Sequence, residues 1–357
     1  MPTKPQKTVT SLQDLADLAG VSRATASRAL NDNPMISAKT REKLKALAKK
    51  YGYSINRQAR DFRLRRTSVI SVVFMLNIKS NQHMSDPFFL DMLGGIADCL
   101  AEHDYDLLLA HAPIENVFDL RNSRVIRQSD GVIFIGQEEQ HQRLNELAKL
   151  ESHIVVWGFP VPDKNYVVVG SDNVSGGYKV TRHLLELGRR NVAFFGNTNN
   201  PENAARYDGY LKALEEFDIE PDPRIKVDVP FEMHHAREAV INFMESDANL
   251  DAVVCISDVL ALATMSTFQE LGVRVPEDVA VVGYDDINLA AYSSPPLTTI
   301  RQYIHQGGRI LVESVLGLIN GENVTDTMLK SELIVRKSSG GETNPAATPP
   351  APDPDAI

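Results

Sequence analysis

The chain has 357 residues, of which 43% are hydrophobic and 24% charged, an ordinary globular composition with room for two or three domains. No apolar run approaches the length of a membrane span, and residues 1–10 lack the hydrophobic stretch of a signal peptide, so we expect a cytoplasmic protein. The net charge of −10 conceals a split: residues 1–66 hold 15 Lys/Arg against 5 Asp/Glu, a balance of +10 (15 − 5), and residues 67–357 hold 22 against 42, a balance of −20 (22 − 42).

A basic segment ahead of an acidic body is typical of a nucleic-acid-binding domain joined to a regulatory or catalytic one, although a solvated basic tail would carry the same charge. Three short helices are predicted within this segment. Ser11 and Asp14 form a capping-box pattern, and small apolar residues recur at helical spacing as far as Gly20, whose freedom at positive φ suits a tight turn. A second helix is expected over residues 23–30 and a third from Ser37 to Tyr51.

Two short helices joined by a glycine-containing turn are typical of a helix-turn-helix, in which the second helix enters the major groove with its N-terminal residues over base edges. Arg23 and Arg28 are therefore candidates for bidentate contacts to guanine. Hydroxyl groups suit phosphate oxygens, and those available here belong to Ser22, Thr25, Ser27 and Thr40. The alternative is that these arginines are ordinary solvated helix residues.

From Val69 onward, short apolar runs alternate with helical stretches. Strands are expected at 69–74, 105–110, 131–135, 154–157, 166–169, 191–195, 225–229, 252–256 and 279–282, and helices at 88–103, 176–187, 204–217 and 235–246. Strands that are apolar throughout predict parallel sheets covered on both faces. Residues 129–135 and 250–256 resemble each other, which favours two doubly wound subdomains.

Ligands of such sheets bind beyond the carboxyl ends of the strands, so a cleft between the two subdomains is expected there. The strand-end residues are Asn77, His111, Gly136, Gly158, Asn197, Ser257, Asp258 and Asp285. Cys99 and Cys255 lie in apolar settings and are interpreted as reduced core thiols. No P-loop, dinucleotide fingerprint or His-Glu-x-x-His motif occurs, and the histidines are scattered, so we expect neither an enzyme nor a cofactor or metal site.

The string TVTSLQDLADLAGVSRATASRALNDNP, followed by ISAKTREKLKALAKKYGYSINRQARDF, resembles the N-terminal domain of the lactose-repressor/galactose-repressor family, and the similarity continues to about Arg336. The resemblance implies that Arg23, Ala24 and Arg28 face bases. It also implies that residues 56–66 form a hinge that becomes helical on the operator, where Phe62 replaces the usual leucine as a minor-groove wedge. Alternatively, Phe62 packs on the core domain. The implied DNA-contacting set is Ser11, Gln13, Ser22, Arg23, Ala24, Thr25, Ser27, Arg28, Asn31, Thr40, Asn56, Arg57, Ala59, Arg60 and Phe62.

The body resembles the periplasmic sugar-binding-protein fold used as a sensor, on the strings DPFF (86–89), ARYDGYLKAL (205–214), VVGYDD (281–286) and SPPLTTIRQ (294–302). The resemblance makes Arg206 and Asp285 a guanidinium and a carboxylate that grip sugar hydroxyls. Arg206 as a surface helix residue and Asp285 as a turn residue are the alternatives, and Trp157 and Phe88 either stack on a sugar or pack in the core. The implied effector-binding set is Asn77, Phe88, Gly136, Trp157, Arg206, Ser257, Asp258, Asp285 and Gln302.

The predicted fold is an all-α helix-turn-helix head joined to an α/β core of two doubly wound parallel-sheet subdomains. We expect a DNA-binding domain at 1–55, a hinge at 56–66, an effector-binding and dimerisation domain at 67–337, and a disordered tail at 338–357. The N-subdomain would take 67–172 and 301–330, and the C-subdomain 173–300 and 331–337.

The predicted function is that of a sequence-specific transcriptional regulator, most simply a repressor, whose affinity for a pseudo-palindromic operator changes with a small carbohydrate. Because the tail lacks an apolar heptad repeat, a homodimer rather than a tetramer is expected. A nucleoside or purine corepressor remains open as the effector, as does the rival class of a nucleotide-using α/β enzyme.

Overall fold

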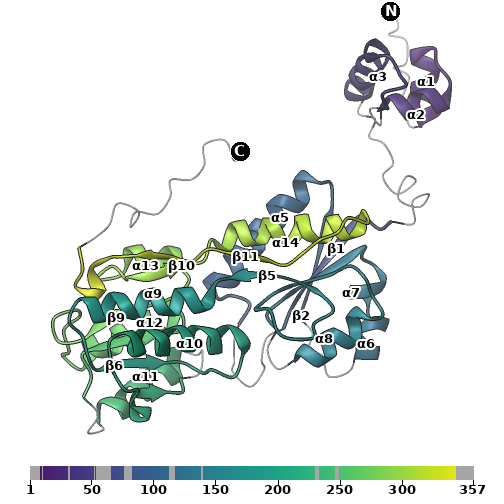
Figure 1. Cartoon of the computed structure of the whole chain (residues 1–357). Helices are drawn as coiled ribbons and strands as arrows, with labels where there is room; N and C mark the ends of the chain where they lie inside the picture. The colour runs from purple at the N-terminus through teal and green to yellow at the C-terminus, as the bar shows by residue number, and fades with distance from the viewer. Residues whose placement is uncertain are drawn as a thin grey trace, which may run out of the picture. The chain divides into compact units, whose positions relative to one another are not determined.

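The computed structural model describes residues 9, 11–30, 33–51, 53, 66–75, 83–111, 117–137, 140–229, 233–245 and 249–342. Its contacts divide the chain into two units, residues 1–67 and 68–357 (Figure 1). The first unit is called the head and the second the body. The hinge residues Asn56, Arg57, Ala59, Arg60 and Phe62 lie outside the described residues, as does Asn31.

The head is built from three helices, α1 (Leu12–Ala19), α2 (Arg23–Leu30) and α3 (Ala38–Tyr51). The capping box is present, because Asp14 N donates to Ser11 Oγ at 3.2 Å and Ser11 N donates to Asp14 Oδ2 at 2.9 Å. Gly20 ends α1 at φ 73°, a conformation that costs glycine little. The small core consists of fully buried side chains, mainly Leu15, Ala16, Ala26, Ala29 and Leu44, so α1, α2 and α3 approach one another closely.

The first half of the body is a six-stranded parallel sheet with strand order β11-β5-β4-β3-β1-β2. Its strands are β1 (Val69–Phe74), β2 (Asp106–His111), β3 (Gly131–Ile135), β4 (Ile154–Trp157), β5 (Val167–Ser171) and β11 (Thr327–Leu329). One face is covered by α5 (Pro87–Glu102) and α14 (Ile304–Ile319), and the other by α6 (Val117–Asn122), α7 (Arg124–Arg127) and α8 (His141–Ala148) (Figure 1).

Alternation along the strands explains why β1 is apolar at every position but one. In β1, Ile70, Val72 and Phe74 pack against α5 and α14, whereas Val73 joins the cluster formed with α6, α7 and α8. Side chains two residues apart share a face, so a strand covered on both faces needs apolar residues at each position. Ser71 is the exception, and its buried hydroxyl donates to Val125 O at 2.7 Å.

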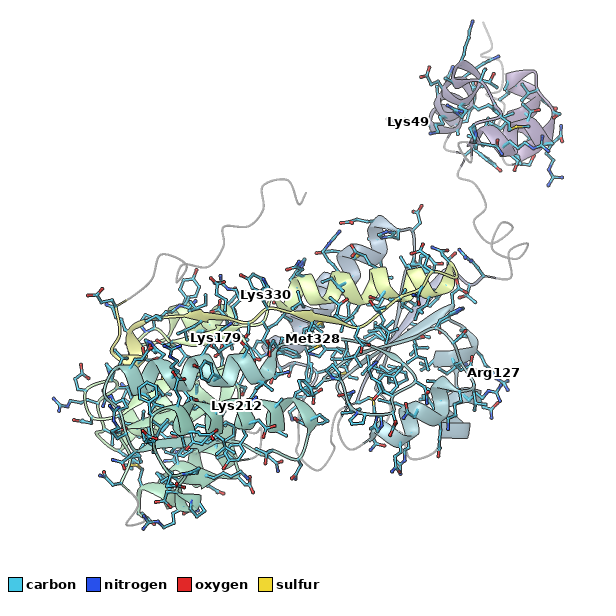
Figure 2. All side chains as sticks on the ribbon, viewed as in Figure 1. Lys49, Arg127, Lys179, Lys212, Met328 and Lys330 are labelled. Carbon is cyan, nitrogen blue, oxygen red and sulfur yellow. The ribbon has the colours of Figure 1, made fainter. Side chains whose placement is uncertain are left out.

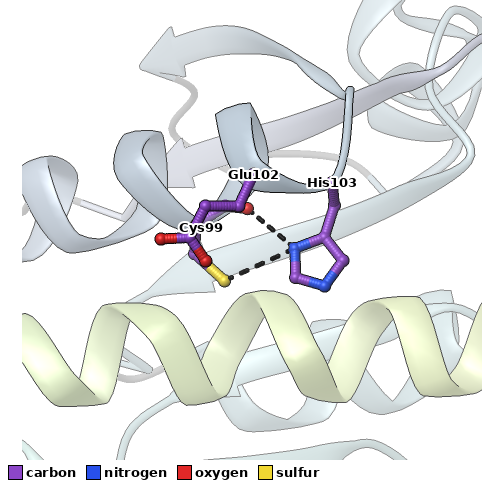
Figure 3. A group of neighbouring side chains, drawn as sticks. All are labelled: Cys99, Glu102 and His103. Carbon is purple, nitrogen blue, oxygen red and sulfur yellow. Dashed lines mark hydrogen bonds between the residues drawn. The ribbon is translucent and has the colours of Figure 1, made fainter.

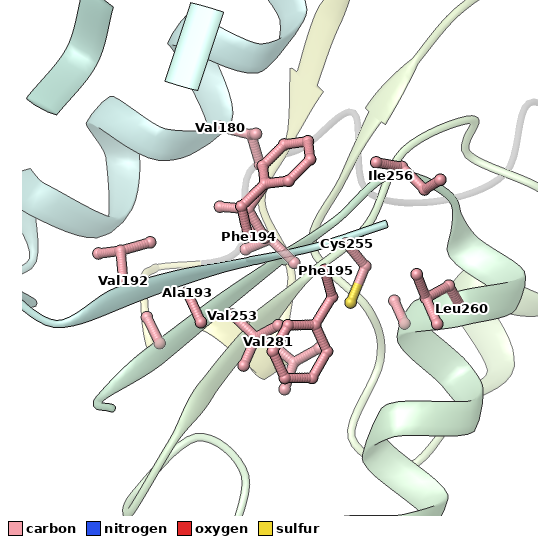
Figure 4. Close-up of a cluster of buried hydrophobic side chains, with 14 of the residues drawn as sticks. Val180, Val192, Ala193, Phe194, Phe195, Val253, Cys255, Ile256, Leu260 and Val281 are labelled. Atoms are coloured by element: carbon pink, nitrogen blue, oxygen red, sulfur yellow. The ribbon is translucent and has the colours of Figure 1, made fainter. Parts of the chain in front are cut away.

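The second half is a four-stranded parallel sheet with strand order β7-β6-β8-β9. Its strands are β6 (Val192–Phe195), β7 (Lys226–Val227), β8 (Ala252–Cys255) and β9 (Ala280–Val282), and its helices are α9 (Asn173–Glu186), α10 (Pro201–Glu216), α11 (Met233–Met244), α12 (Asp258–Glu270) and α13 (Asn288–Tyr292). Figure 4 shows Phe194 and Phe195 on opposite faces of β6. Phe194 packs beside Tyr210 of α10, and Phe195 packs beside Phe243 of α11.

Helices α9 and α10 begin earlier than the sequence pattern predicts. Asp172 caps α9 by accepting from Ser175 N at 3.0 Å, and Asn200 caps α10 by accepting from Asn203 N at 2.8 Å. The predicted ranges start three residues late because they follow the apolar periodicity, whereas the polar caps set where each helix begins. The first turn of α10 therefore includes Glu202, one helical turn before Arg206.

The chain passes between the two sheets at β5–α9, at β10–α14 and at β11–β12. Strands β10 (Thr299–Arg301) and β12 (Glu332–Ile334) pair antiparallel. The carboxylate of Asp286 forms ion pairs with Arg301 of β10 and with Arg336, which follows β12, each at 2.7 Å. These two ion pairs link the two crossing segments. Lys179 of α9 donates to Ser331 O at 2.7 Å, and Figure 2 shows Lys179, Met328 and Lys330 along this part of the body.

The predicted start of the disordered tail at residue 338 is wrong. The short 3₁₀-helices are η3 (Pro223–Ile225) and η4 (Lys337–Ser339), and in η4 both serines are buried. Ser338 Oγ donates to Val281 O at 2.6 Å and accepts from Thr298 N at 2.8 Å. A Ser-Gly-rich composition resembles a linker, but small hydroxyl side chains also fit where backbone groups satisfy them. The described chain continues to Glu342.

Candidate functional site

Helix α2 turns its alanines inward and its polar side chains outward. Ala26 and Ala29 are fully buried, whereas Ser22, Arg23, Ala24 and Arg28 are exposed. Ser22 Oγ accepts from Thr25 N at 3.1 Å and so caps the helix. Neither Arg23 nor Arg28 has an ion-pair partner among the described residues of the head. The predicted base-reading residues thus lie on the accessible side of α2, Arg23 and Ala24 in its first turn and Arg28 in its last.

Other predicted DNA contacts have partners within the head. Ser11 Oγ is occupied by the capping box, and Gln13 Nε2 donates to Asp17 Oδ1 at 2.8 Å. Ser37 Oγ accepts from Thr40 N at 3.3 Å, which places Thr40 at the start of α3. Lys43 Nζ donates to Ala19 O at 2.9 Å, so this lysine closes the end of α1. By contrast, Lys49 is exposed on α3 (Figure 2).

The body contains a cavity of about 90 Å³ between its two sheets. Its wall comes from both halves, at the carboxyl ends of β1, β3, β4, β8 and β9 and at the first turns of α5 and α10, where ligands of parallel sheets bind. The lining residues are Met75, Asp86, Phe88, Phe89, Ile135, Gly136, Gln137, Trp157, Asn200, Glu202, Asn203, Arg206, Ser257 and Asp285.

Arg206 reaches the cavity from α10 because α9 and α10 lie in close contact. A Cβ atom on Gly177 would come within 2.0 Å of Arg206 O, and one on Gly209 within 2.2 Å of Val174 O, so any larger residue at either position would force the helices apart. The Arg206 side chain is 9% exposed. Its Nε donates to Asn173 Oδ1 at 2.9 Å, and its Nη1 donates to Ile256 O. The surface-helix alternative for Arg206 is therefore wrong.

The guanidinium of Arg206 also lies over the ring of Tyr284, with Cζ 3.9 Å from the ring centroid. It forms no ion pair within 4 Å with any described carboxylate, although Asp285 lines the same cavity. The two opposite charges are therefore held near each other but unpaired. Such an arrangement can bind a ligand that both donates and accepts hydrogen bonds.

Asp285 occupies a backbone conformation that non-glycine residues rarely adopt, with φ 119°. Its N–H donates to Ile300 O at 2.8 Å, and its Oδ1 accepts from Gln302 Nε2. Gln302 Oε1 in turn accepts from Ser171 Oγ at the end of β5, so the Asp285 carboxylate is held by both halves of the body. Burial raises the pKa of Asp285 to about 7, although the Arg206 guanidinium opposes that shift.

Trp157 and Phe88 combine the two roles that the sequence left as alternatives. Trp157 is 5% exposed and belongs to the core beneath α5 and α14, yet it lines the cavity. Phe88 is half-buried, and the two ring centroids lie 6.2 Å apart with a tilt of 55°. An apolar corner therefore lies beside the charged wall, which suits the C–H faces of a sugar.

Two residues predicted to contact the effector, Asp258 and Gln302, do not line the cavity. Asp258 lies behind the wall and is fully buried, because it accepts from Thr299 Oγ1 and from Ile287 N at 2.9 Å. Burial and the neighbouring Asp285 raise the pKa of Asp258 well above the usual range. Gln302 does not line the cavity either and acts through Asp285. Asn77 lies outside the described residues, as does the side chain of His111.

Sequence reasoning missed several polar lining residues: Asp86, Gln137, Asn200, Glu202 and Asn203. Asp86 precedes α5, where its carboxylate accepts from Phe88 N at 2.9 Å. Gln137 directly follows Gly136 at the end of β3 and is held by Tyr166 and Phe159 N. Asn200, Glu202 and Asn203 lie at the start of α10. The spacing of four residues between Glu202 and Arg206 places both on one face of a helix, and this spacing was the signal available in the sequence.

Among the residues that the structure describes, one group of metal-ligating side chains occurs outside this cavity, Cys99, Glu102 and His103 on α5 (Figure 3). Glu102 is paired with Arg309 at 2.7 Å, which lowers its pKa. His103 Nδ1 lies 2.8 Å from Cys99 O, and burial raises the pKa of the Cys99 thiol. These contacts explain the cluster as the end of a helix packed on α14.

Among the described residues, no helix is long and apolar enough to cross a membrane.

Comparison with known proteins relates both parts of the chain to regulators. A family model for bacterial regulatory proteins of the lacI family matches residues 11–56, and one for a periplasmic binding protein-like domain matches residues 181–339. The HTH-type transcriptional regulator CelR of Thermobifida fusca is 32% identical over 336 residues, which cover 92% of this chain and 98% of that protein.

The HTH-type transcriptional repressor PurR of Photobacterium profundum is 29% identical over 338 residues, which cover 92% of this chain and 98% of that protein. The solved structure of the transcriptional regulator CelR–cellobiose complex aligns with a TM-score of 0.68 at 29% identity. That alignment covers 92% of this chain and 100% of the other.

Proposed function

The chain belongs to the lacI family of bacterial regulatory proteins and is a transcriptional regulator, and from this premise we propose that its head binds operator DNA while its body senses a small carbohydrate. In this proposal the protein binds its ligands without catalysing a reaction, and it acts in the cytoplasm. The observation that carries the carbohydrate proposal is the buried pair of Arg206 and Asp285, which line one cavity without pairing with each other.

A polyol fits this wall because each of its hydroxyls both donates and accepts. The guanidinium supplies donors, the carboxylate supplies acceptors, and the apolar corner of Phe88 and Trp157 suits the C–H face of a sugar ring. The solved CelR complex contains cellobiose, and its alignment with 92% of this chain supports a related ligand here.

A purine or nucleoside effector is the rival, since the PurR relative has similar identity and coverage. A flat base binds best between parallel aromatic faces. The rings of Phe88 and Trp157 are tilted by 55°, so they offer a corner instead of a slot. The geometry therefore favours the carbohydrate.

On the DNA side, we propose that Arg23, Ala24 and Arg28 read bases from α2 while Ser22, Thr25, Ser27 and Thr40 contact phosphates. The support for the residues of α2 is its exposed face opposite the buried alanines, and Thr40 lies instead at the start of α3. The domain boundaries proposed here are 1–55 for the head and 56–66 for the hinge, followed by the effector-binding body.

We also propose a homodimer, because two heads related by a two-fold axis match a pseudo-palindromic operator. Light scattering at micromolar protein should then give about twice the 39.5 kDa chain mass. A monomer that binds operator tightly, or a stable tetramer, would contradict this proposal.

The coupling between the two sites is reciprocal: a ligand that weakens operator binding is itself bound more weakly in the presence of operator, by the same factor. The test is a calorimetric screen of sugars and nucleosides on the full chain. Every compound that binds is then titrated into a complex with DNA selected from a random library. Carbohydrate binding that changes DNA affinity supports the proposal, and binding of nucleosides alone would replace it with the rival.

A further inference from the structure

The cavity wall contains more carboxyl groups than cationic groups. Its described lining residues include the carboxylates of Asp86, Glu202 and Asp285 but a single guanidinium, that of Arg206. With all four groups ionised, the described wall would have a formal charge of −2 (1 − 3). Burial raises the pKa of all three carboxyls, so the wall alone holds less negative charge than this at pH 7, and a bound cation would favour their ionised forms. Neutral sugars need acceptors and donors but no such excess.

The protein leaves these carboxylates without cationic partners. No described lysine, arginine or histidine forms an ion pair within 4 Å with Asp86, Glu202 or Asp285. By contrast, Asp286, the residue after Asp285, forms ion pairs with both Arg301 and Arg336. Asp285 is 7% exposed, and its Oδ1 accepts from Gln302 Nε2.

A preformed metal site does not account for this excess. Metal ligands must converge on one point, and the only convergent group within the described residues is the one on α5. The three carboxylates come from the start of α5, the first turn of α10 and the loop after β9, and they are not among the described groups whose ligating atoms all lie within 4.8 Å of one another. They can surround a ligand but are too dispersed to chelate an ion.

The aromatic corner provides a second feature that suits a cation. Phe88 and Trp157 line the same cavity, and Phe88 follows Asp86 by two residues, so aromatic and anionic groups adjoin. An ammonium group is attracted both to carboxylates and to the faces of aromatic rings. A phosphate or carboxylate on the ligand would instead meet the excess negative charge at short range.

We propose that the effector is an amino sugar, in which a protonated primary amine occupies the carboxylate-rich wall while the hydroxyls contact Arg206 and Asp285. This inference rests on the proposed carbohydrate-sensing function and narrows its ligand class. Sugar phosphates, uronic acids and nucleotides are expected to bind weakly, because each brings a further anion to a wall with three carboxyl groups and one guanidinium.

The test measures affinities of the full chain by calorimetry for matched triplets of compounds. Each triplet contains a 2-amino-2-deoxyhexose, its N-acetyl derivative and the parent hexose, in the gluco, galacto and manno configurations, at pH 7. In at least one configuration, the amine should bind about tenfold more tightly than both neutral counterparts, the gain expected of one charge-assisted hydrogen bond. A parent hexose that binds as tightly as its amine in every configuration would overturn the inference.

Two substitutions locate the preference on the wall. Glu202→Gln and Asp86→Asn keep the shape and remove one charge each, and each should lower the amine-to-hexose affinity ratio by about threefold or more. Asp208→Asn is the matched control, because Asp208 is exposed on α10 and does not line the cavity. It should leave the ratio unchanged. Melting temperatures of the three variants identify any that fail to fold.

The outcomes separate this inference from the function on which it rests. Tight binding and operator release by a neutral hexose alone would retain carbohydrate sensing and overturn the amine preference. An amine preference that ignores both wall substitutions would also overturn it. Binding by nucleosides alone, or by none of the compounds at millimolar concentration, would overturn both. An amine preference that falls in both wall variants and persists in the control supports the inference.

Discussion

The residues proposed to read bases are exposed on α2, above a small core of alanines, leucines and a valine, whereas Arg206 and Asp285 in the body are more than nine-tenths buried. Arg23 and Arg28 have no ion-pair partners among the described residues, but Arg206 is fixed by Asn173, Ile256 and the ring of Tyr284. The head thus presents charge for a highly charged polymer, and the body holds charge rigidly for a small ligand. Four experiments test this contrast.

Removing residues 1–66 has the largest expected effect. The truncated protein should lose all measurable affinity for DNA selected by the full chain, because the basic charge and the proposed base-reading face both lie in the head. Fluorescence anisotropy measures the DNA affinity, and calorimetry with the ligand found by the sugar screen serves as the control for a folded body. Retained operator binding would show that the DNA-binding surface lies elsewhere.

Substitutions in the cavity should affect the ligand and spare the operator. Asp285→Asn and Arg206→Ala should each weaken ligand binding by about 10- to 100-fold, corresponding to the loss of hydrogen bonds to charged groups. DNA affinity without ligand should stay within about twofold of the unmodified chain. Arg206→Ala also removes the bonds to Asn173 and Ile256, so Asp285→Asn is the cleaner test. If both variants bind ligand normally, the site is not this cavity.

Arg23→Ala and Arg28→Ala should each cost about 1–3 kcal/mol of operator affinity and relax base preference at one position. Lys49→Ala is the control, because Lys49 is exposed on α3 outside the predicted reading face. Its loss should weaken binding equally on all DNA sequences and reduce the salt dependence. Binding to a library of operator variants measures both patterns, and identical specificity profiles for all three proteins would contradict the assignment of α2.

The smallest effect concerns stability and pH. Because burial raises the pKa of Asp285 to about 7, above the range of an unfolded aspartate, the folded body binds this proton more tightly than the unfolded chain does. The contribution of the Asp285 carboxyl to the free energy of unfolding is therefore greatest at low pH, and it is lost as the pH rises towards 7. In Asp285→Asn, the melting temperature should fall less between pH 5 and 8. The difference should be about 2–4 °C for each kcal/mol of unfolding free energy that the titration of Asp285 contributes over this range. Equal slopes in both proteins would show that Asp285 titrates normally.

Much of the fold follows from local pattern. The helices of the head begin at Ser or a residue after it and end at turn residues, and the apolar strands of the body repeat at regular intervals, so short stretches of sequence suffice to place them. The head's proposed contact face follows as well, since helical periodicity alone separates the buried Ala26 and Ala29 from the exposed Arg23 and Arg28.

Other features depended on partners distant in the chain. Asp258 and Asp285 both follow a strand, yet only Asp285 reaches the cavity, because Thr299 and Ile287 N hold Asp258 behind the wall. The composition around Ser338 predicts a linker, but its hydroxyl is hydrogen-bonded to Val281 O and to Thr298 N, both of which are distant in the chain.

By itself, the sequence determined the two-part organisation, the helix-turn-helix and the paired parallel sheets, because those depend on periodicity and capping. The arginine and aspartate proposed for the cleft came from motifs that resemble those of a known family. Only the tertiary structure decided which carboxylates share one wall. Asp86 and Glu202 are 116 residues apart (202 − 86), and nothing local to either indicates the other. Charge balance within a cavity is a property of segments brought together by folding, so the excess of carboxylates over cations could be recognised only once the wall was assembled.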